Sequence, residues 1–153
     1  MQPWPRRATL TLIVIFAGSL AALGQQKDEP KSADLQVWSI RATTKNKDIS
    51  PELRDLADKL KKQFKFTGFK LEKRDSGKTD FGKTFTQTLI GGYEARVTPQ
   101  KRDDKRITLQ IEVVKGKDRQ LNTTITLDAG KFQLWGGWSL EGGDALIVAV
   151  SAK

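Results

Sequence analysis

The stretch ITLQIEVVKGKDRQLNTTITL, residues 107–127, decides the fold, because apolar and polar side chains alternate along it twice. Successive side chains of a β-strand point to opposite faces, so each half is expected to be a strand with one apolar and one wet face. The polar turn Lys115–Asp118 separates the two halves. The positions expected to face the core are Ile107, Leu109, Ile111, Val113, Leu121, Thr123, Ile125 and Leu127. This pattern is typical of an antiparallel sheet that covers a core with one face.

Further strands are expected on both sides of this stretch. Gly91-Gly92 is a two-residue hairpin signal between two of them. The run ALIVAV, residues 145–150, is apolar throughout and predicts a central strand covered on both faces. The other expected segments are strands at 35–43, 66–74, 84–90, 93–98 and 131–135, a turn at Asp75-Ser76-Gly77, and a charged loop at 99–105.

One helix is expected, at about residues 51–64, after the first strand. Ser50 suits the N-cap and Pro51 the first helical position. Leu53, Leu56, Ala57, Leu60 and Phe64 recur at spacings of three and four residues and form one apolar stripe. Asp55–Lys59 and Asp58–Lys62 are expected to form ion pairs across one helical turn. The predicted class is therefore α+β: mainly an antiparallel β sheet or sandwich carrying one amphipathic helix.

Residues 1–24 have the features of a signal peptide. Arg6 and Arg7 precede an apolar run, and Ala22 and Gly24 provide small residues at the cleavage site. We expect cleavage after Gly24, a flexible polar tether at 25–34, a single β-rich domain at 35–153, and a secreted or periplasmic location. The alternative is an uncleaved anchor, although the run 8–23 is shorter than the roughly 20 residues of a spanning helix. No later segment is predicted to cross a membrane.

The chain contains no cysteine and no histidine. Catalysis by Ser-His-Asp or Cys-His systems and zinc sites built from thiolate or imidazole are therefore excluded. We expect no catalytic residue, no metal and no cofactor. A small carboxylate-dependent hydrolase remains the alternative, although the acidic residues lie in turns, charged loops and expected ion pairs.

Positive charge is concentrated in one segment of this chain of net charge +9. Residues 59–74 hold seven basic residues and one acid, Glu72. From this segment Lys59, Lys62, Lys65, Lys70 and Arg74 are the candidate binding residues, with an anionic envelope polymer as the candidate partner. The plainer interpretation is a solvated helix whose lysines complete ion pairs and the helix dipole. Nucleic acid is disfavoured as a partner, because the neighbouring phenylalanines are expected in the core.

Trp135 and Trp138 flank Gly136-Gly137 and are the remaining candidate binding residues. Exposed tryptophans beside a flexible turn can stack on sugars or fill a pocket on a partner protein. The alternative is a pair of core aromatics on either side of a chain reversal.

Residues 119–138, RQLNTTITLDAGKFQLWGGW, resemble a short strand–turn–strand hairpin of secretins, the ring-forming outer-membrane channels of bacterial secretion systems. The resemblance covers 20 residues, and Trp138 stands where secretins usually have an aliphatic residue. It implies an envelope location and association through β-strands. More broadly, a leader followed by a small β-rich domain is similar to uncharacterised secreted bacterial proteins.

These observations predict an exported, non-enzymatic binding or interaction domain of the cell envelope, which contacts anionic polymers or another β protein. A component of an envelope secretion or assembly complex is the second hypothesis, supported by the secretin-like segment. The sequence leaves the oligomeric state open.

Overall fold

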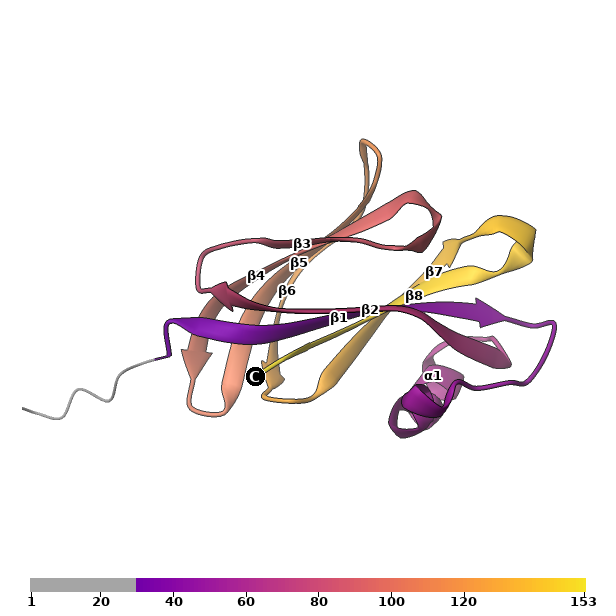
Figure 1. Cartoon of the computed structure of the whole chain (residues 1–153), viewed down its shortest axis with the longest axis horizontal. Coiled ribbons are helices and arrows are strands. Elements are labelled where there is room, and N and C mark those ends of the chain that lie inside the picture. Colours follow the sequence, from indigo (N-terminus) through magenta and orange to yellow (C-terminus); the bar gives the residue numbers. More distant parts are fainter. Residues whose placement is uncertain (1–29) are drawn as a thin grey trace, which may run out of the picture.

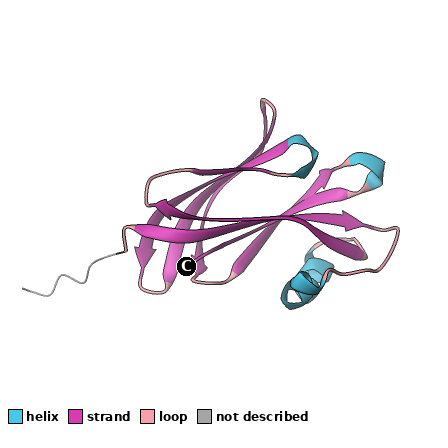
Figure 2. Cartoon of the chain, viewed as in Figure 1, coloured by secondary structure: helices cyan, strands magenta, loops and turns pink. Residues whose placement is uncertain are grey.

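The computed structural model describes residues 30–153, which form two four-stranded antiparallel sheets and one short helix (Figures 1 and 2). The strand order is β2-β1-β8-β7 in the first sheet and β3-β4-β5-β6 in the second. The strands are β1 (Ser32–Thr43), β2 (Gly68–Asp80), β3 (Phe85–Thr88), β4 (Tyr93–Asp103), β5 (Arg106–Lys115), β6 (Asp118–Asp128), β7 (Phe132–Ser139) and β8 (Ala145–Ala152). The predicted α+β class is confirmed. The expected signal peptide and the first part of the expected tether lie outside the described residues.

Strands that follow one another along the chain are paired, except at two places. Between β2 and β3, and again between β6 and β7, the chain leaves one sheet and enters the other. We call these places the β2–β3 seam and the β6–β7 seam. Because β1 also pairs with β8, the topology is that of an up-and-down barrel opened along two lines.

The first sheet is the middle layer of the molecule. Its inner face packs on the second sheet around residues such as Val37, Ile111 and Val148. Part of its outer face, around Ile40 and Ile147, is covered by a 3-10 helix, η1 (Pro51–Leu56), and by α1 (Ala57–Gln63). Every residue of β8 is buried, which confirms the prediction of a central strand covered on both faces.

The helix differs from its prediction in its first half. Residues 51–56 form a 3-10 helix, and only 57–63 are α-helical. Ser50 occupies the N-cap but makes no capping hydrogen bond; its hydroxyl accepts one from the N–H of Leu71, at 3.0 Å. Leu71 lies beside the register shift between β1 and β2, where a backbone N–H needs a partner outside the ladder.

Several boundaries were predicted wrongly. Residues 75–77, expected as a turn, lie inside β2 and pair with Val37, Gln36 and Leu35 of β1. Most of the expected charged loop 99–105 belongs to β4, which continues to Asp103 with Pro99 buried. The first strand begins at Ser32, within the expected tether. The ends of β1 and β2 are extended by pairing with each other across about 40 residues of sequence, and β4 is extended by pairing with β5, so that the β4–β5 hairpin turn is shorter than the polar residues indicate.

Candidate functional site

The best candidate for a binding site is a groove of about 380 Å³ between α1 and the edge strand β7. We call it the α1–β7 groove. The side chain of Gln63 donates a hydrogen bond of 3.0 Å to the carbonyl oxygen of Leu134, which holds the end of α1 against β7. The groove is lined by Lys59, Lys62, Gln63, Phe132, Gln133 and Leu134.

Lys59 and Lys62 lie three residues apart on α1, a spacing that places two side chains on one helix face. Both are exposed. The ion pairs expected with Asp55 and Asp58 were predicted wrongly: neither occurs among the ion pairs within residues 30–153. The positive charge of these two lysines is therefore not neutralised by either of these carboxylates.

An aromatic stack adjoins the groove. The rings of Phe132 and Trp38 are 4.5 Å apart between centroids and tilted by 47°. The guanidinium carbon of Arg74 lies 5.2 Å from the centroid of the Trp38 ring, within the range of a cation–π interaction. The structure therefore brings three predicted residues, Lys59, Lys62 and Arg74, to the outer side of the first sheet.

The two remaining predicted lysines lie elsewhere. Lys65 is exposed in the connection between α1 and β2. Lys70 is exposed near the start of β2, with its Nζ 3.9 Å from a carboxylate oxygen of Glu72. It lines a separate cavity of about 330 Å³ that also includes Arg41 and Asp144.

Trp135 and Trp138 are partly buried and pack against the core between the two sheets. Trp138 lies beside Tyr93, with 6.2 Å between ring centroids. Gly136 and Gly137 are part of β7, so no chain reversal occurs there. Because α1 packs on the opposite face of the first sheet, the tryptophans and the α1–β7 groove do not share a surface.

Asp144 and Arg41 form the centre of an ionic cluster near the end of β1. Arg41 is 2.9 Å from Glu72 and 3.5 Å from Asp144. A hydrogen bond from the Thr43 side chain, with the positive charges of Lys45 and Arg41, lowers the pKa of Asp144. Asp144 therefore remains ionised at neutral pH, whereas a general acid requires a raised pKa.

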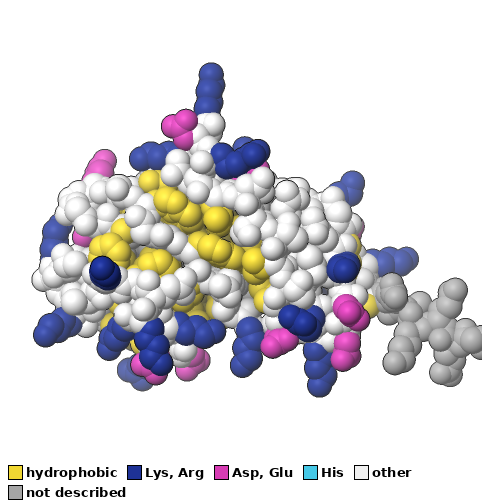
Figure 3. All heavy atoms as spheres, turned by 180° about the vertical axis from the view of Figure 1, so that it is seen from behind, with side chains coloured by type: hydrophobic (Ala, Val, Ile, Leu, Met, Phe, Trp, Pro, Cys, Tyr) yellow, Lys and Arg dark blue, Asp and Glu magenta, His cyan; other side chains and the backbone are white. Residues whose placement is uncertain are grey.

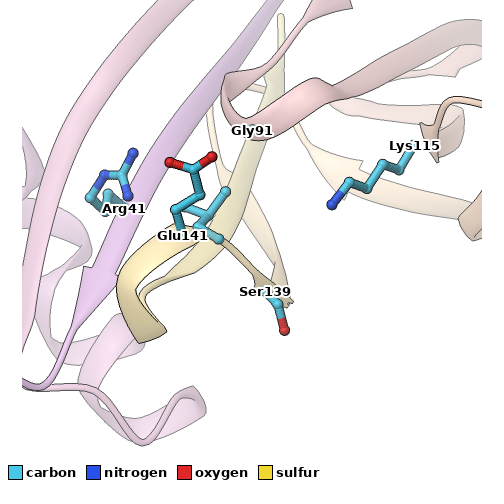
Figure 4. Close-up of a pocket in the computed structure, with 6 residues that line it drawn as sticks. Arg41, Gly91, Lys115, Ser139 and Glu141 are labelled. Carbon is cyan, nitrogen blue, oxygen red and sulfur yellow. The ribbon is translucent and has the colours of Figure 1, made fainter.

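A cavity of about 600 Å³ lies at the end of the two sheets, beside two similar turns. In residues 89–93 and 140–144 the first residue donates its N–H to the last carbonyl oxygen, at 2.8 Å in both. Figure 4 shows the Glu141 carboxylate between Arg41 of β1 and Lys115 of β5. The positive charge of Arg41 is already paired with two carboxylates, Glu72 and Asp144. The other two charged residues that line the cavity, Glu141 and Lys115, carry opposite charges. The cavity consequently favours neither anionic nor cationic ligands.

The sequence identified the lysines of the groove but not its other residues. Phe132 and Gln133 were placed in a strand without a role, and Trp38 in the first strand. Their proximity depends on pairing of β8 with both β1 and β7, which brings Trp38 and Phe132 together. The alternation around Trp38 was the only local signal, and it indicated burial on one face.

In comparisons with known proteins, no family model and no curated protein matches this chain. The segment 119–138 is not a hairpin, because β6 pairs with β5 in one sheet and β7 with β8 in the other. Within residues 30–153 no group of three or more potential metal ligands is found, and no helix has the length and apolar character needed to span a bilayer.

Proposed function

We propose that this protein is an exported, non-enzymatic binding domain of the cell envelope that holds an extended anionic polymer in the α1–β7 groove. The observation that carries the proposal is that Lys59 and Lys62 line one groove, are both exposed, and form no ion pair with Asp55 or Asp58. Two ammonium groups on a short rigid element offer several hydrogen-bond donors at a fixed spacing.

The rest of the groove suits a ligand with repeated anionic groups and an apolar or sugar backbone. Phe132 is partly buried and presents an aromatic surface beside the lysines. Gln133 is exposed and adds donor and acceptor groups. Arg74, which lies over the Trp38 ring on the same side of the sheet, strengthens the positive field around the site and so raises association rates for anions.

The ionisation and the position of the carboxyl groups favour a binding function over hydrolysis. The most enclosed acid of the ionic cluster, Asp144, has a lowered pKa and interacts with Arg41 and Lys45. A carboxylate hydrolase needs one acid that remains protonated near neutral pH. Among the described residues that line the groove, none is an acid.

The proposal is tested by measuring the binding of polyphosphate and of poly-glutamate of matched length at low salt. We expect the double variant Lys59→Gln/Lys62→Gln to bind about tenfold more weakly than the wild type, because each exposed ionic contact contributes a modest amount. The preferred polymer distinguishes phosphate from carboxylate recognition.

The control is Lys105→Gln/Lys117→Gln, which removes the same charge from exposed turn positions of the second sheet. We expect this control to bind within about twofold of the wild type, since long-range effects of exposed charges are screened. Equal weakening in both double variants would show that only net charge matters, and no binding of either polymer by the wild type would refute the proposal.

A further inference from the structure

The two sheets have four edge strands, and three of them are protected against pairing with another chain. β2 carries charged residues along most of its length. β3 has only four residues. β7 is interrupted by the register shift between Gly136 and Trp138, and one of its carbonyl oxygens, that of Leu134, already accepts a hydrogen bond from the Gln63 side chain. Charges, short length and bulges are the usual devices that keep edges from associating.

β6 has none of these devices over its central part. The register shift between β5 and β6 falls at Gln120, and the regular segment that follows it, residues 121–127 (LNTTITL), contains no charge, no proline and no glycine. The side chains of Asn122, Thr124 and Thr126 are exposed and uncharged. Threonine favours extended strands, so β6 has a regular and unprotected edge over residues 121–127.

A band of hydrophobic side chains borders this edge. Leu121 and Ile125 of β6, and Trp135 and Trp138 of β7, are only partly buried against the core between the sheets. Figure 3 shows such a band crossing the rear face of the molecule, where hydrophobic atoms reach the surface. Contiguous apolar surface of this kind commonly marks a site of protein association.

The opposite seam is closed by its own side chains. The Nζ of Lys73 in β2 donates to the carbonyl oxygen of Thr88 in β3, at 2.5 Å. The ring of Phe85 lies directly over Gly77 of β2, where no Cβ would fit. The two seams therefore differ: the β2–β3 seam is bridged, and the β6–β7 seam leaves an apolar surface beside a free strand edge.

We propose that β6 pairs with β6 of a second copy of this chain, antiparallel and about a two-fold axis. The central segment is complementary to itself. With Thr124 opposite Thr124, Asn122 faces Thr126 of the other copy on the outer side, and Leu121 faces Leu127 on the inner side. No two like charges are opposed in this register, and Thr–Thr pairs are favourable across antiparallel strands.

This pairing joins the two second sheets into one continuous sheet of twice the width. It satisfies the outward N–H and C=O groups of both β6 strands. It also brings the two β6–β7 seams together, so that each copy covers part of the apolar band of the other. The proposed dimer surface lies on β6 and is distinct from the α1–β7 groove. Dimerisation and anion binding can therefore be tested independently of one another.

The first test is sedimentation of the purified protein up to about 100 μM, a concentration at which a micromolar complex is dimeric. Thr124→Lys would place two ammonium groups opposite one another and should raise the dimer dissociation constant at least about tenfold. Ser76→Lys adds the same charge at an exposed position of β2 and should leave the constant unchanged. A monomeric wild type, an unaffected Thr124→Lys dimer, or equal loss in both variants would each overturn the proposal.

The second test uses the absence of cysteine in the chain. Directly opposed residues of an antiparallel pair have Cβ atoms about 4.5–5.5 Å apart, close to disulfide geometry. Mild oxidation should therefore crosslink Thr124→Cys into a dimer, whereas the control Ser76→Cys should remain monomeric under denaturing electrophoresis. Crosslinking of Thr124→Cys no faster than the control would contradict the register. If Thr124→Cys, oxidised in the presence of envelope proteins, were crosslinked only to a different protein, β6 would be an edge for another partner and self-pairing would be refuted.

Discussion

Replacing Gly136 by alanine tests whether the Gly-Gly pair lies inside a strand, as the structure shows, or in a flexible turn. A Cβ at Gly136 would lie 2.5 Å from the carbonyl oxygen of Leu146 and 2.6 Å from the Cα of Ile147. Both are backbone atoms of β8, which is buried along its whole length. Gly137 provides a matched control, because nothing lies within 4 Å of the corresponding position.

The expected magnitudes follow from these distances. Both glycines have positive φ, 156° for Gly136 and 92° for Gly137, and alanine in such a conformation costs roughly 1–2 kcal/mol. Overlap with a well-packed neighbour adds roughly 1–3 kcal/mol at Gly136 alone. We therefore expect Gly136→Ala to lower the free energy of unfolding by about 2–5 kcal/mol, and Gly137→Ala by about 1–2 kcal/mol.

The assay is urea denaturation followed by tryptophan fluorescence, since Trp135 and Trp138 lie on either side of the substitutions. Midpoints are converted to free energies with a shared slope, provided that the slopes agree. If the two variants had equal stabilities, or if Gly137→Ala were the less stable one, the close contact between β7 and β8 would be refuted.

Two further predictions concern the helix layer and the ionic cluster. Leu60→Ala should lower the free energy of unfolding by about 2–4 kcal/mol, because Leu60 of α1 is fully buried between this helix and the first sheet; a loss below about 1 kcal/mol in urea denaturation would contradict this packing. The lowered pKa of Asp144 means that its stabilising contribution is present above the unfolded-state pKa of about 3.9 and is lost as the pH falls through the folded-state value. Asp144→Asn should therefore have a lower urea midpoint than the wild type at pH 7, and the difference should narrow below about pH 4. A difference that is independent of pH would refute the ionic explanation.

The sequence predicted the elements whose patterns are local. The alternation in residues 107–127 and the run 145–150 predicted β5, β6 and β8. Gly91-Gly92 predicted the hairpin between β3 and β4, but the predicted two-residue turn was wrong, because β3 ends at Thr88 and four residues, 89–92, connect the strands. The turn at 75–77 was wrong because Asp, Ser and Gly favour turns, whereas pairing with β1 keeps this segment extended. Ser50 was predicted to cap the helix, but its hydroxyl accepts a hydrogen bond from the N–H of Leu71 instead. Residues near Ser50 in the sequence give no indication of this distant partner.

The candidate site was also predictable only in part, because some of its contacts join residues that are distant in the sequence. A cluster of lysines is visible in the sequence, but whether acids neutralise it depends on side-chain geometry in the folded chain. Asp55 and Asp58 have the spacing for ion pairs with Lys59 and Lys62, yet the 3-10 geometry of residues 51–56 changes the relation between the first acid and its lysine. The aromatic partners of the lysines come from strands far away in the sequence.

The most direct test of the central claim is the salt dependence of polyphosphate binding by the wild type and by Lys59→Gln/Lys62→Gln. Removing one lysine–phosphate interaction should reduce the slope of log affinity against log salt concentration by somewhat less than one. We predict a slope smaller by roughly one to two in the double variant, and an unchanged slope in Lys105→Gln/Lys117→Gln. Equal slopes for the wild type and the Lys59→Gln/Lys62→Gln variant would contradict the assignment of the anion site to the α1–β7 groove.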